Sequence, residues 1–490
     1  MTDDASGAEP PGYVPERPGD VPERPGDVPE RPGDVPEVRD RWLLVSVAGV
    51  LSFVAMLDMN IVNVALADIS EGLGVSAATA QWAVLGYQLP VVALLLPVGH
   101  WLDDMSVRPA LLAATAGFGL CGALAAASPW AFWLIAARIG QGACGAVLFV
   151  LMPVLAVRSV RPELRGRAMS VPATLGPLGA VVGPAAGGLL LDHLGWRWIF
   201  LVKIPLCLVA LAVVWRAMPR GGRLRGPDRR SLADTALVAT GVTILLLSLT
   251  LGSDAPAWLA LALVAVPPLW WWLRGPGGRP VTGLLRAAGL LRVHGAVLAL
   301  AVGFAAMHYV VALRLQRDED VSATTTGLTV LAFPLGMGLA GPLGGRLADR
   351  CGARPVAVTG AALTATGLLL LVLPGAGWSP PEVAWRLVLA GLGMGLTGGP
   401  TQALVMGAAP PGRAATVGST VQLARSLGFT LGPALATAAW RLTGPDGGAR
   451  TGLAPAATAA CLAVPLLALP ARGPANLPGS ATDATSAAPR

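Results

Sequence analysis

The chain has 490 residues, of which 54% are hydrophobic and only 13% are charged, and its formal net charge is +7. Soluble domains carry about 25% charged residues, so this composition excludes an ordinary soluble protein and predicts a polytopic membrane protein. Most arginines lie in short loops between apolar segments, a pattern that sets membrane orientation and argues against nucleic-acid binding. The five cysteines lack metal-ligand spacing, so we expect no metal site and no disulfide framework.

The first forty residues contain three copies of the heptad VPERPGD, which begin at Val14, Val21 and Val28. This region has no apolar core and therefore does not resemble a signal peptide. Two prolines in each copy exclude a coiled coil, and the alternating charges leave nothing to bury. We therefore predict a disordered cytoplasmic tail at residues 1–40, and we expect a second one at residues 472–490.

The rest of the chain divides at charged and Pro/Gly-rich breaks into apolar segments suited to a hydrocarbon core about 30 Å thick. Fourteen transmembrane helices are predicted in this way. They lie near residues 42–66, 78–98, 110–127, 130–157, 169–191, 198–215, 232–251, 258–273, 294–315, 325–343, 355–373, 385–408, 415–440 and 453–469.

The arginines support this count because they concentrate in the loops that follow even-numbered segments. By the positive-inside rule, both termini are then cytoplasmic. Lys203 is the only lysine among 35 basic residues, and this bias, with the abundance of Ala, Gly and Pro, suggests a GC-rich bacterial genome. The expected location is therefore the bacterial plasma membrane, with membrane lipid around the helices.

Two sequence patterns recur along the chain. The loop GHWLDDMSVRP begins at Gly99 and recurs as GRLADRCGARP from Gly345, an offset of 246 residues. GAVVGP begins at Gly179 and recurs as GFTLGP from Gly428, an offset of 249 residues. Because the two matches have nearly the same offset, they indicate two homologous halves, an organisation typical of secondary transporters. The predicted domains are an N-terminal six-helix bundle, two inserted transmembrane helices and a C-terminal six-helix bundle, at residues 41–218, 219–275 and 276–471.

Several motifs, taken in chain order, resemble those of the major facilitator superfamily, and within it the 14-helix drug:proton antiporter family. They are LDMNIVNVALADI (57–69), RIGQG (138–142), GPAAGG (183–188), GWRWIFLVKIP (195–205) and the two loops. The resemblance covers about residues 41–470 and implies an all-α membrane protein of two six-helix bundles with two extra central helices. Asn60 and Lys203 depart from the family pattern, in which threonine and asparagine are usual, and Asp104 and Ser106 make the first loop degenerate.

The resemblance also implies a function. A protein of this family is expected to be a monomer that exports a hydrophobic or cationic drug or antibiotic in exchange for protons, with no cofactor and no enzymatic activity. The chain has no phosphate-loop motif, so ATP is not implied. Two alternatives stay open, which are proton-coupled uptake of a small metabolite and a non-transporting membrane sensor.

Asp58 is the candidate proton carrier. It lies sixteen residues into its predicted helix, about 24 Å from the cytoplasmic end, where an ionised carboxylate costs about 2.5 to 3.5 kcal/mol. Arg138 is expected at a comparable depth, so the two side chains are predicted to meet. A nearby cation favours the ionised carboxylate and a low dielectric favours the protonated one, so a conformational change that alters this balance takes up and releases protons. A static structural ion pair is the alternative.

Two further basic residues fall within predicted spans. Lys203 lies near the outer end of its span, where it either extends to the interface, binds an anionic substrate or pairs with Asp58. Arg425 lies in the middle of the thirteenth span. We expect it to be structural or cavity-lining, because arginine does not release its proton in proteins.

Small residues and loop charges mark the predicted moving parts. Gly179, Gly183 and Gly187 recur every fourth residue and leave a bare stripe on one helix face, and Pro184 is expected to add a kink. With Gly188, they match the motif that the resemblance assigns to the antiporter hinge, and simple helix packing is the alternative. The loops are predicted cytoplasmic gates, although their charges also serve as topology signals. The candidate gate residues are Gly99, Asp103, Arg108, Gly345, Asp349, Arg350, Gly352 and Arg354.

Polar and aromatic residues within the spans are candidates for lining a substrate cavity. They are Asn60, Asn63, Trp82, Tyr87, Gln88, Gln141, Lys203, His308, Tyr309 and Arg425. For several of them, a position facing lipid or the interface is an equally acceptable interpretation.

Overall fold

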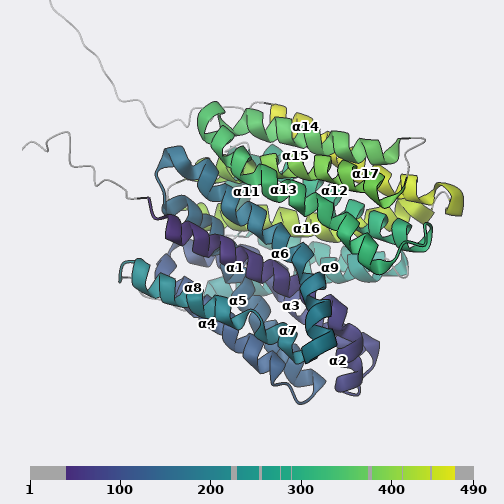
Figure 1. Cartoon of the computed structure of the whole chain (residues 1–490). Coiled ribbons are helices and arrows are strands. Elements are labelled where there is room, and N and C mark those ends of the chain that lie inside the picture. Colours follow the sequence, from purple (N-terminus) through teal and green to yellow (C-terminus); the bar gives the residue numbers. More distant parts are fainter. Residues whose placement is uncertain are drawn as a thin grey trace, which may run out of the picture. The chain divides into compact units, whose positions relative to one another are not determined.

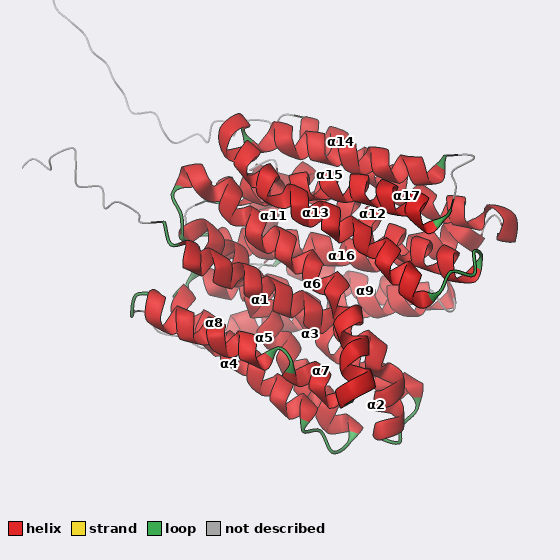
Figure 2. Cartoon of the chain, viewed as in Figure 1, coloured by secondary structure: helices red, strands yellow, loops and turns green. Residues whose placement is uncertain are grey.

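The computed structural model describes most of the chain, and every described residue outside short loops is helical (Figure 2). The described residues are 40–221, 229–252, 256–275, 278–287, 290–373, 378–410, 412–441 and 444–469. The predicted tails lie outside the described residues, apart from Asp40. The Asp40 carboxylate, just before the first helix, accepts hydrogen bonds from the backbone N–H of Arg161 at 3.0 Å and from the Arg161 guanidinium at 3.1 and 3.2 Å.

We call the helices before residue 218 the first bundle (purple to teal in Figure 1). They are α1 (Trp42–Ile61), η1 (Val62–Ala65), α2 (Leu66–Gly72), α3 (Ala77–Asp103), α4 (Val107–Ala126), α5 (Ala131–Arg158), η2 (Pro162–Leu164), α6 (Arg165–Leu194), α7 (Arg197–Leu201) and α8 (Ile204–Ala217). The first predicted span is therefore not one regular helix. It is interrupted at η1, where the Asn63 side chain donates to the Asn60 carbonyl and competes with the helical backbone pattern.

The inserted helices and the second bundle follow. The inserted elements are α9 (Arg229–Gly252), η3 (Pro256–Ala260), α10 (Leu261–Arg274) and the short α11 (Gly278–Ala287). The second bundle comprises α12 (Leu290–Arg317), α13 (Ala323–Cys351), α14 (Ala353–Val372), α15 (Pro380–Gly407), α16 (Ala414–Arg441) and α17 (Gly444–Ala468). Helix α9 packs against α10, α3 and α16, so the inserted pair lies beside both bundles.

Each of the fourteen predicted segments falls on one helix or on consecutive helical elements, but not all of these meet the length and hydropathy of a membrane span. Among the described residues, 10 candidate spans meet both conditions. The apolar parts of α9 and α10 are shorter, and α15 and α16 do not meet the criteria despite their 28 residues each. The fourteen-span count and the cytoplasmic termini therefore stay predictions.

The same helix pairing occurs in both bundles. In the first bundle α1 packs on α6, α3 on α5 and α4 on α8, and in the second bundle α12 packs on α16, α13 on α15 and α14 on α17. The contacts between the bundles are also related by the repeat: α3 packs on α16, and its equivalent α13 packs on α6, the equivalent of α16. This is the packing expected of two homologous halves.

Glycines permit the closest of these contacts. A Cβ atom on Gly179 would lie 3.0 Å from the carbonyl carbon of Phe53 on α1, and one on Gly183 would lie 3.1 Å from the Leu57 carbonyl oxygen. Gly187 packs on Ile61 in the same way. The predicted stripe therefore contacts α1. Gly188 does not belong to it, because nothing lies within 4 Å of a Cβ placed there.

We expect Gly179→Ala to destabilise the protein and Gly188→Ala to leave it unchanged or slightly more stable. The first change forces a methyl group against the α1 backbone, at a typical cost of about 1–3 kcal/mol. The second meets open space and gains up to about 1 kcal/mol of helix propensity. Thermal unfolding of the purified protein in detergent measures both. Equal melting temperatures for the two variants would contradict the close α1–α6 contact.

Candidate functional site

A buried ion cluster lies inside the first bundle. The Asp58 carboxylate of α1 accepts a hydrogen bond from Arg138 Nη1 of α5 at 2.7 Å, and its other oxygen forms an ion pair with Lys203 Nζ. All three side chains are completely buried. The predicted contact between Asp58 and Arg138 is therefore present. The structure adds a second cation on the same carboxylate.

The Arg138 guanidinium is held from several sides. Its Nε donates to the Ala83 carbonyl at 2.7 Å, and its Nη1 also donates to Gln141 Oε1 at 2.9 Å. Its guanidinium carbon lies 4.5 Å from the centre of the Tyr87 ring, whose hydroxyl donates to the Ala55 carbonyl at 3.3 Å. This arginine is thus positioned by α3 and by its own helix as well as by Asp58.

Lys203 does not extend to the membrane interface. It occupies the break between α7 and α8, and its Nζ lies 5.4 Å from the ring centres of both Phe118 and Phe200. Aromatic faces stabilise a buried ammonium by cation–π attraction. Of the three alternatives for Lys203, the structure therefore selects pairing with Asp58. The cluster holds one carboxylate and two basic side chains.

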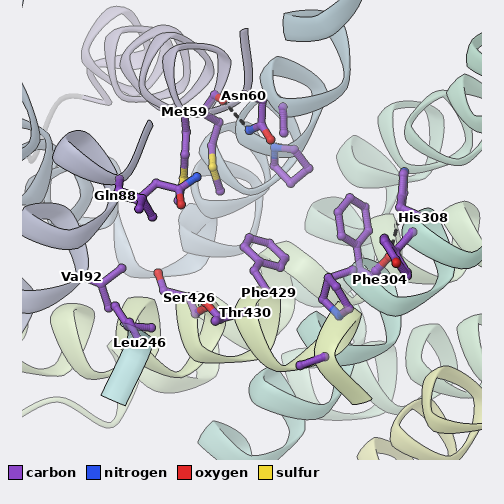
Figure 3. Close-up of a pocket in the computed structure, with 18 of the residues that line it drawn as sticks. Met59, Asn60, Gln88, Val92, Leu246, Phe304, His308, Ser426, Phe429 and Thr430 are labelled. Atoms are coloured by element: carbon purple, nitrogen blue, oxygen red, sulfur yellow. Dashed lines mark hydrogen bonds between the residues drawn. The ribbon is translucent and has the colours of Figure 1, made fainter. Parts of the chain in front are cut away.

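A cavity of about 510 Å³ lies between the two bundles. Asn60 and Gln88 project into it from the first bundle, and Phe304, His308 and Phe429 project from the second (Figure 3). Of the predicted cavity residues, four line it, namely Asn60, Gln88, His308 and Tyr309. Arg425 lines two smaller cavities of about 60 and 30 Å³ that share wall residues with the main one.

The other predicted cavity residues lie elsewhere. Tyr87, Gln141 and Lys203 belong to the buried ion cluster, on the side of their helices away from the cavity. Trp82 is 41% exposed on the outside of α3, and Asn63 is exposed and bonded to the Asn60 carbonyl. Successive helical residues point about 100° apart, so residue type alone did not reveal which of them face the cavity.

Sequence reasoning missed the cavity wall formed by α16. Ser426, Phe429 and Thr430 line the main cavity, and they lie 249 residues after Pro177, Ala180 and Val181, which line it from α6. The repeat offset of 249 residues could have identified these α16 positions as equivalents of the α6 positions. No such signal exists for Leu246 of the inserted α9, which lines the same cavity.

The two loop aspartates connect the bundles at the ends of α3 and α13. Asp349 accepts hydrogen bonds from the backbone N–H groups of Gly166 at 2.8 Å and Arg167 at 3.2 Å, at the start of α6. We call these contacts the first latch. A carboxylate is favoured here because the N-terminus of a helix carries partial positive charge and unpaired N–H groups.

The second latch is the repeat-related equivalent. Asp103 accepts from the backbone N–H groups of Ala415 at 2.9 Å and Thr416 at 3.2 Å, at the start of α16, and also from the Thr416 hydroxyl. Glycines let these helices approach, since a Cβ on Gly345 would lie 2.9 Å from Ser170 Oγ. Gly99 approaches Ser419 in the same way.

The predicted gate arginines do not cross between bundles. Arg108 donates to the Trp215 carbonyl at 3.0 Å, and Arg354 donates to the Leu469 carbonyl at 3.1 Å, so each ties two helices of one bundle together. Arg350 is exposed at the end of α13. Gly352 has a φ angle of 90°, which favours glycine and allows the sharp turn into α14. Of the charged residues predicted for the gates, Asp103 and Asp349 form the inter-bundle contacts, because a carboxylate can accept from a helix N-terminus.

Comparison with known proteins places the chain in a family. Residues 48–285 and 294–489 match the model described as the Major Facilitator Superfamily. The chain belongs to the major facilitator superfamily. With its apolar helices and bacterial relatives, this superfamily member is a multi-pass protein of the bacterial cell membrane.

Two relatives and one solved structure illustrate the similarity. The methyl viologen resistance protein SmvA of Salmonella typhimurium is 28% identical over 411 residues, which are 81% of each chain. A probable actinorhodin transporter of Streptomyces coelicolor is 29% identical over 417 residues, 81% of this chain and 72% of the relative. The proton:xylose symporter XylE has the same fold, with a TM-score of 0.62, 15% identity, and 87% of this chain and 94% of that chain covered.

We expect the double variant Asp103→Asn with Asp349→Asn to open the latched end of this superfamily member. Each change removes a negative charge from a helix N-terminus, where it stabilises by about 0.3–2 kcal/mol. To measure opening, Ser170, which is buried beside Gly345, is replaced by cysteine, and the exposed native Cys351 is removed. The rate at which this cysteine reacts with a water-soluble maleimide in detergent is then compared with and without the double change. The control is Asp104→Asn, because Asp104 is the exposed neighbour of Asp103. The same labelling rate in both backgrounds would mean that the latches do not hold the bundles together.

Proposed function

We propose that the protein exports a hydrophobic small molecule, such as a drug or an antibiotic, in exchange for protons. The observation that carries this proposal is a completely buried, ion-paired carboxylate on the same helix that lines the inter-bundle cavity. Ionisable side chains inside a membrane are costly, and they characteristically occur where ions or substrates pass. A proton site and a substrate site on one helix are what coupled transport needs.

The two sites share helices but use different faces. On α1, Met56, Met59 and Asn60 line the cavity while Asp58 faces the ion cluster. On α3, Gln88 lines the cavity and its neighbour Tyr87 packs on Arg138. A movement of α1 or α3 that follows protonation therefore changes the shape of the cavity. This is a direct mechanical link between proton and substrate.

Asn60 belongs to the substrate side of this arrangement. Its amide donates to the Met56 carbonyl at 2.8 Å, and its side chain lines the cavity. It makes no hydrogen bond to the ion cluster in the described part of the chain. We infer that the replacement of the family's usual threonine by Asn60 alters substrate selection and leaves the proton site unchanged.

The exchange cycle follows from the ion cluster and the latches. A proton on Asp58 removes the charge that attracts Arg138 and Lys203, so protonation loosens the contacts among α1, α5 and the α7–α8 break. With Asp58 ionised and the latches formed, the end at which α3 and α13 terminate is held shut. We propose that protonation and latch release alternate as the bundles rock around the cavity.

The direction of transport rests on the relatives, whose names include resistance to methyl viologen and transport of actinorhodin. Both names fit removal of a compound from the cell. Uptake of a metabolite and a non-transporting sensor are the competing functions. We propose a monomer that works within membrane lipid, because each bundle is complete in one chain.

We expect the Asp58→Asn variant to lose proton-coupled transport, because an amide of similar size cannot take up and release a proton. In everted membrane vesicles with a preformed proton gradient, candidate drugs should collapse the gradient in the parent protein and not in the variant. The control is Asp68→Asn, which removes an exposed carboxylate from α2 and should behave like the parent.

The outcomes separate the alternatives. An unchanged response in Asp58→Asn would refute the role of this residue in coupling. Compound accumulation in intact cells would favour uptake. Binding of a compound with neither flux nor proton movement would favour a sensor.

A further inference from the structure

No carboxylate lines the main cavity or the two smaller cavities that Arg425 lines, within the residues that the structure describes. Asp58 is the sequence neighbour of the cavity-lining Met59, but it lies on the opposite face of α1 and is enclosed by Arg138 and Lys203. A cationic substrate would therefore enter the cavity without a counterion. Burial of an unpaired charge is strongly unfavourable, so the cavity does not suit a cation.

Arg425 supplies the opposite charge. It lies eleven residues after the start of α16, about 16 Å along the helix, and so near the middle of its span. Its Nη1 donates to Gln422 Oε1 at 3.3 Å, and among the described carboxylates none lies within ion-pairing distance. The guanidinium thus differs from that of Arg138, whose charge is balanced by Asp58.

Arg425 is connected to the main cavity. The 60 Å³ cavity that it lines shares the walls Phe304, Phe429 and Pro177 with the main cavity. A guanidinium is planar and presents several N–H donors in a fixed fork, a geometry that matches carboxylate, sulfonate and phosphate groups. An acidic group on a ligand would complete the pairing that the protein leaves open.

The neighbouring walls favour an aromatic ligand with a hydroxyl group. The Phe304 ring centre lies 5.7 Å from that of Phe429 and 4.2 Å from that of His308. His308 Nδ1 donates to the Phe304 carbonyl at 3.0 Å, since a carbonyl can only accept. This leaves Nε2 as an acceptor, and this buried atom has no partner among the described residues. A phenolic hydroxyl is a suitable donor to it.

We propose that the cavity binds aromatic organic anions, with the acidic group on Arg425, the ring system against Phe304 and Phe429, and a phenolic hydroxyl donating to His308. This inference rests on the proposed function, because it names the substrate class of the same cavity. It replaces the cationic compounds expected from family resemblance with phenolic acids.

Two dyes with one xanthene ring system test the charge preference. Fluorescein carries a carboxylate and phenolic oxygens, whereas rhodamine 123 is a cation. We expect the purified full-length protein in lipid nanodiscs to bind fluorescein at least about tenfold more tightly than rhodamine 123, as measured by fluorescence anisotropy without a proton gradient. Methyl viologen, a dication, should not displace fluorescein.

Variants at Arg425 test the site itself. Arg425→Gln should weaken fluorescein binding by about tenfold or more and leave rhodamine 123 binding unchanged or stronger. Arg425→Lys keeps the charge without the fork and should retain part of the affinity. The control is Arg317→Gln, which removes an equal charge from an exposed position at the end of α12. Melting temperatures confirm that each variant is folded.

The results distinguish this inference from the proposed function. Tighter binding of rhodamine 123, unchanged fluorescein affinity in Arg425→Gln, or no saturable binding of fluorescein would overturn the anion site. If fluorescein binds through Arg425 but its addition never collapses a proton gradient in vesicles, the anion site stands and proton-coupled export fails. If gradient collapse depends on Asp58 but not on Arg425 or dye charge, export stands and the anion site fails.

Discussion

The neutralisation of Asp58 is the interaction on which the rest of the first bundle depends. A carboxylate that is completely buried must be paired, and its two partners come from α5 and from the break between α7 and α8. Those partners are themselves held by the Ala83 carbonyl and by aromatic rings from α3, α4 and α7. Asp58 therefore links α1 to α5 and to the α7–α8 break, and through these partners to α3 and α4. Loss of this charge would leave both basic side chains buried without a counterion.

The latches also neutralise carboxylates, at the end of the molecule where α3 and α13 terminate. Each uses one aspartate at the end of a helix of one bundle and the N-terminal N–H groups of a helix of the other. The two latches are related by the internal repeat, so the inter-bundle contact is nearly symmetric. Such contacts are individually modest and exposed in part, which suits the opening and closing that the proposed exchange cycle requires.

Charge is unevenly distributed between the buried ion cluster and the cavity. The single negative charge of the cluster pairs with two basic side chains and does not face the cavity. Arg425, by contrast, lines the smaller cavities and has no carboxylate partner in the described chain. The inserted α9 adds Leu246 to the apolar wall. Under the proposed function, proton coupling and substrate selection involve different charges, so one can change without the other.

The positions of the helices, the internal duplication and the pairing of Asp58 with Arg138 were all predictable from the sequence. These features depend on local hydropathy, on repeated motifs and on the cost of a buried charge. Three features required the folded structure: the second cation on Asp58 is Lys203, Tyr87 faces the cluster while Gln88 faces the cavity, and the gate arginines bond within their own bundles. Local sequence could not decide these features, because the helices are apolar on nearly every face. Their rotation about their own axes is therefore set by contacts with helices distant in the chain, which no local pattern encodes.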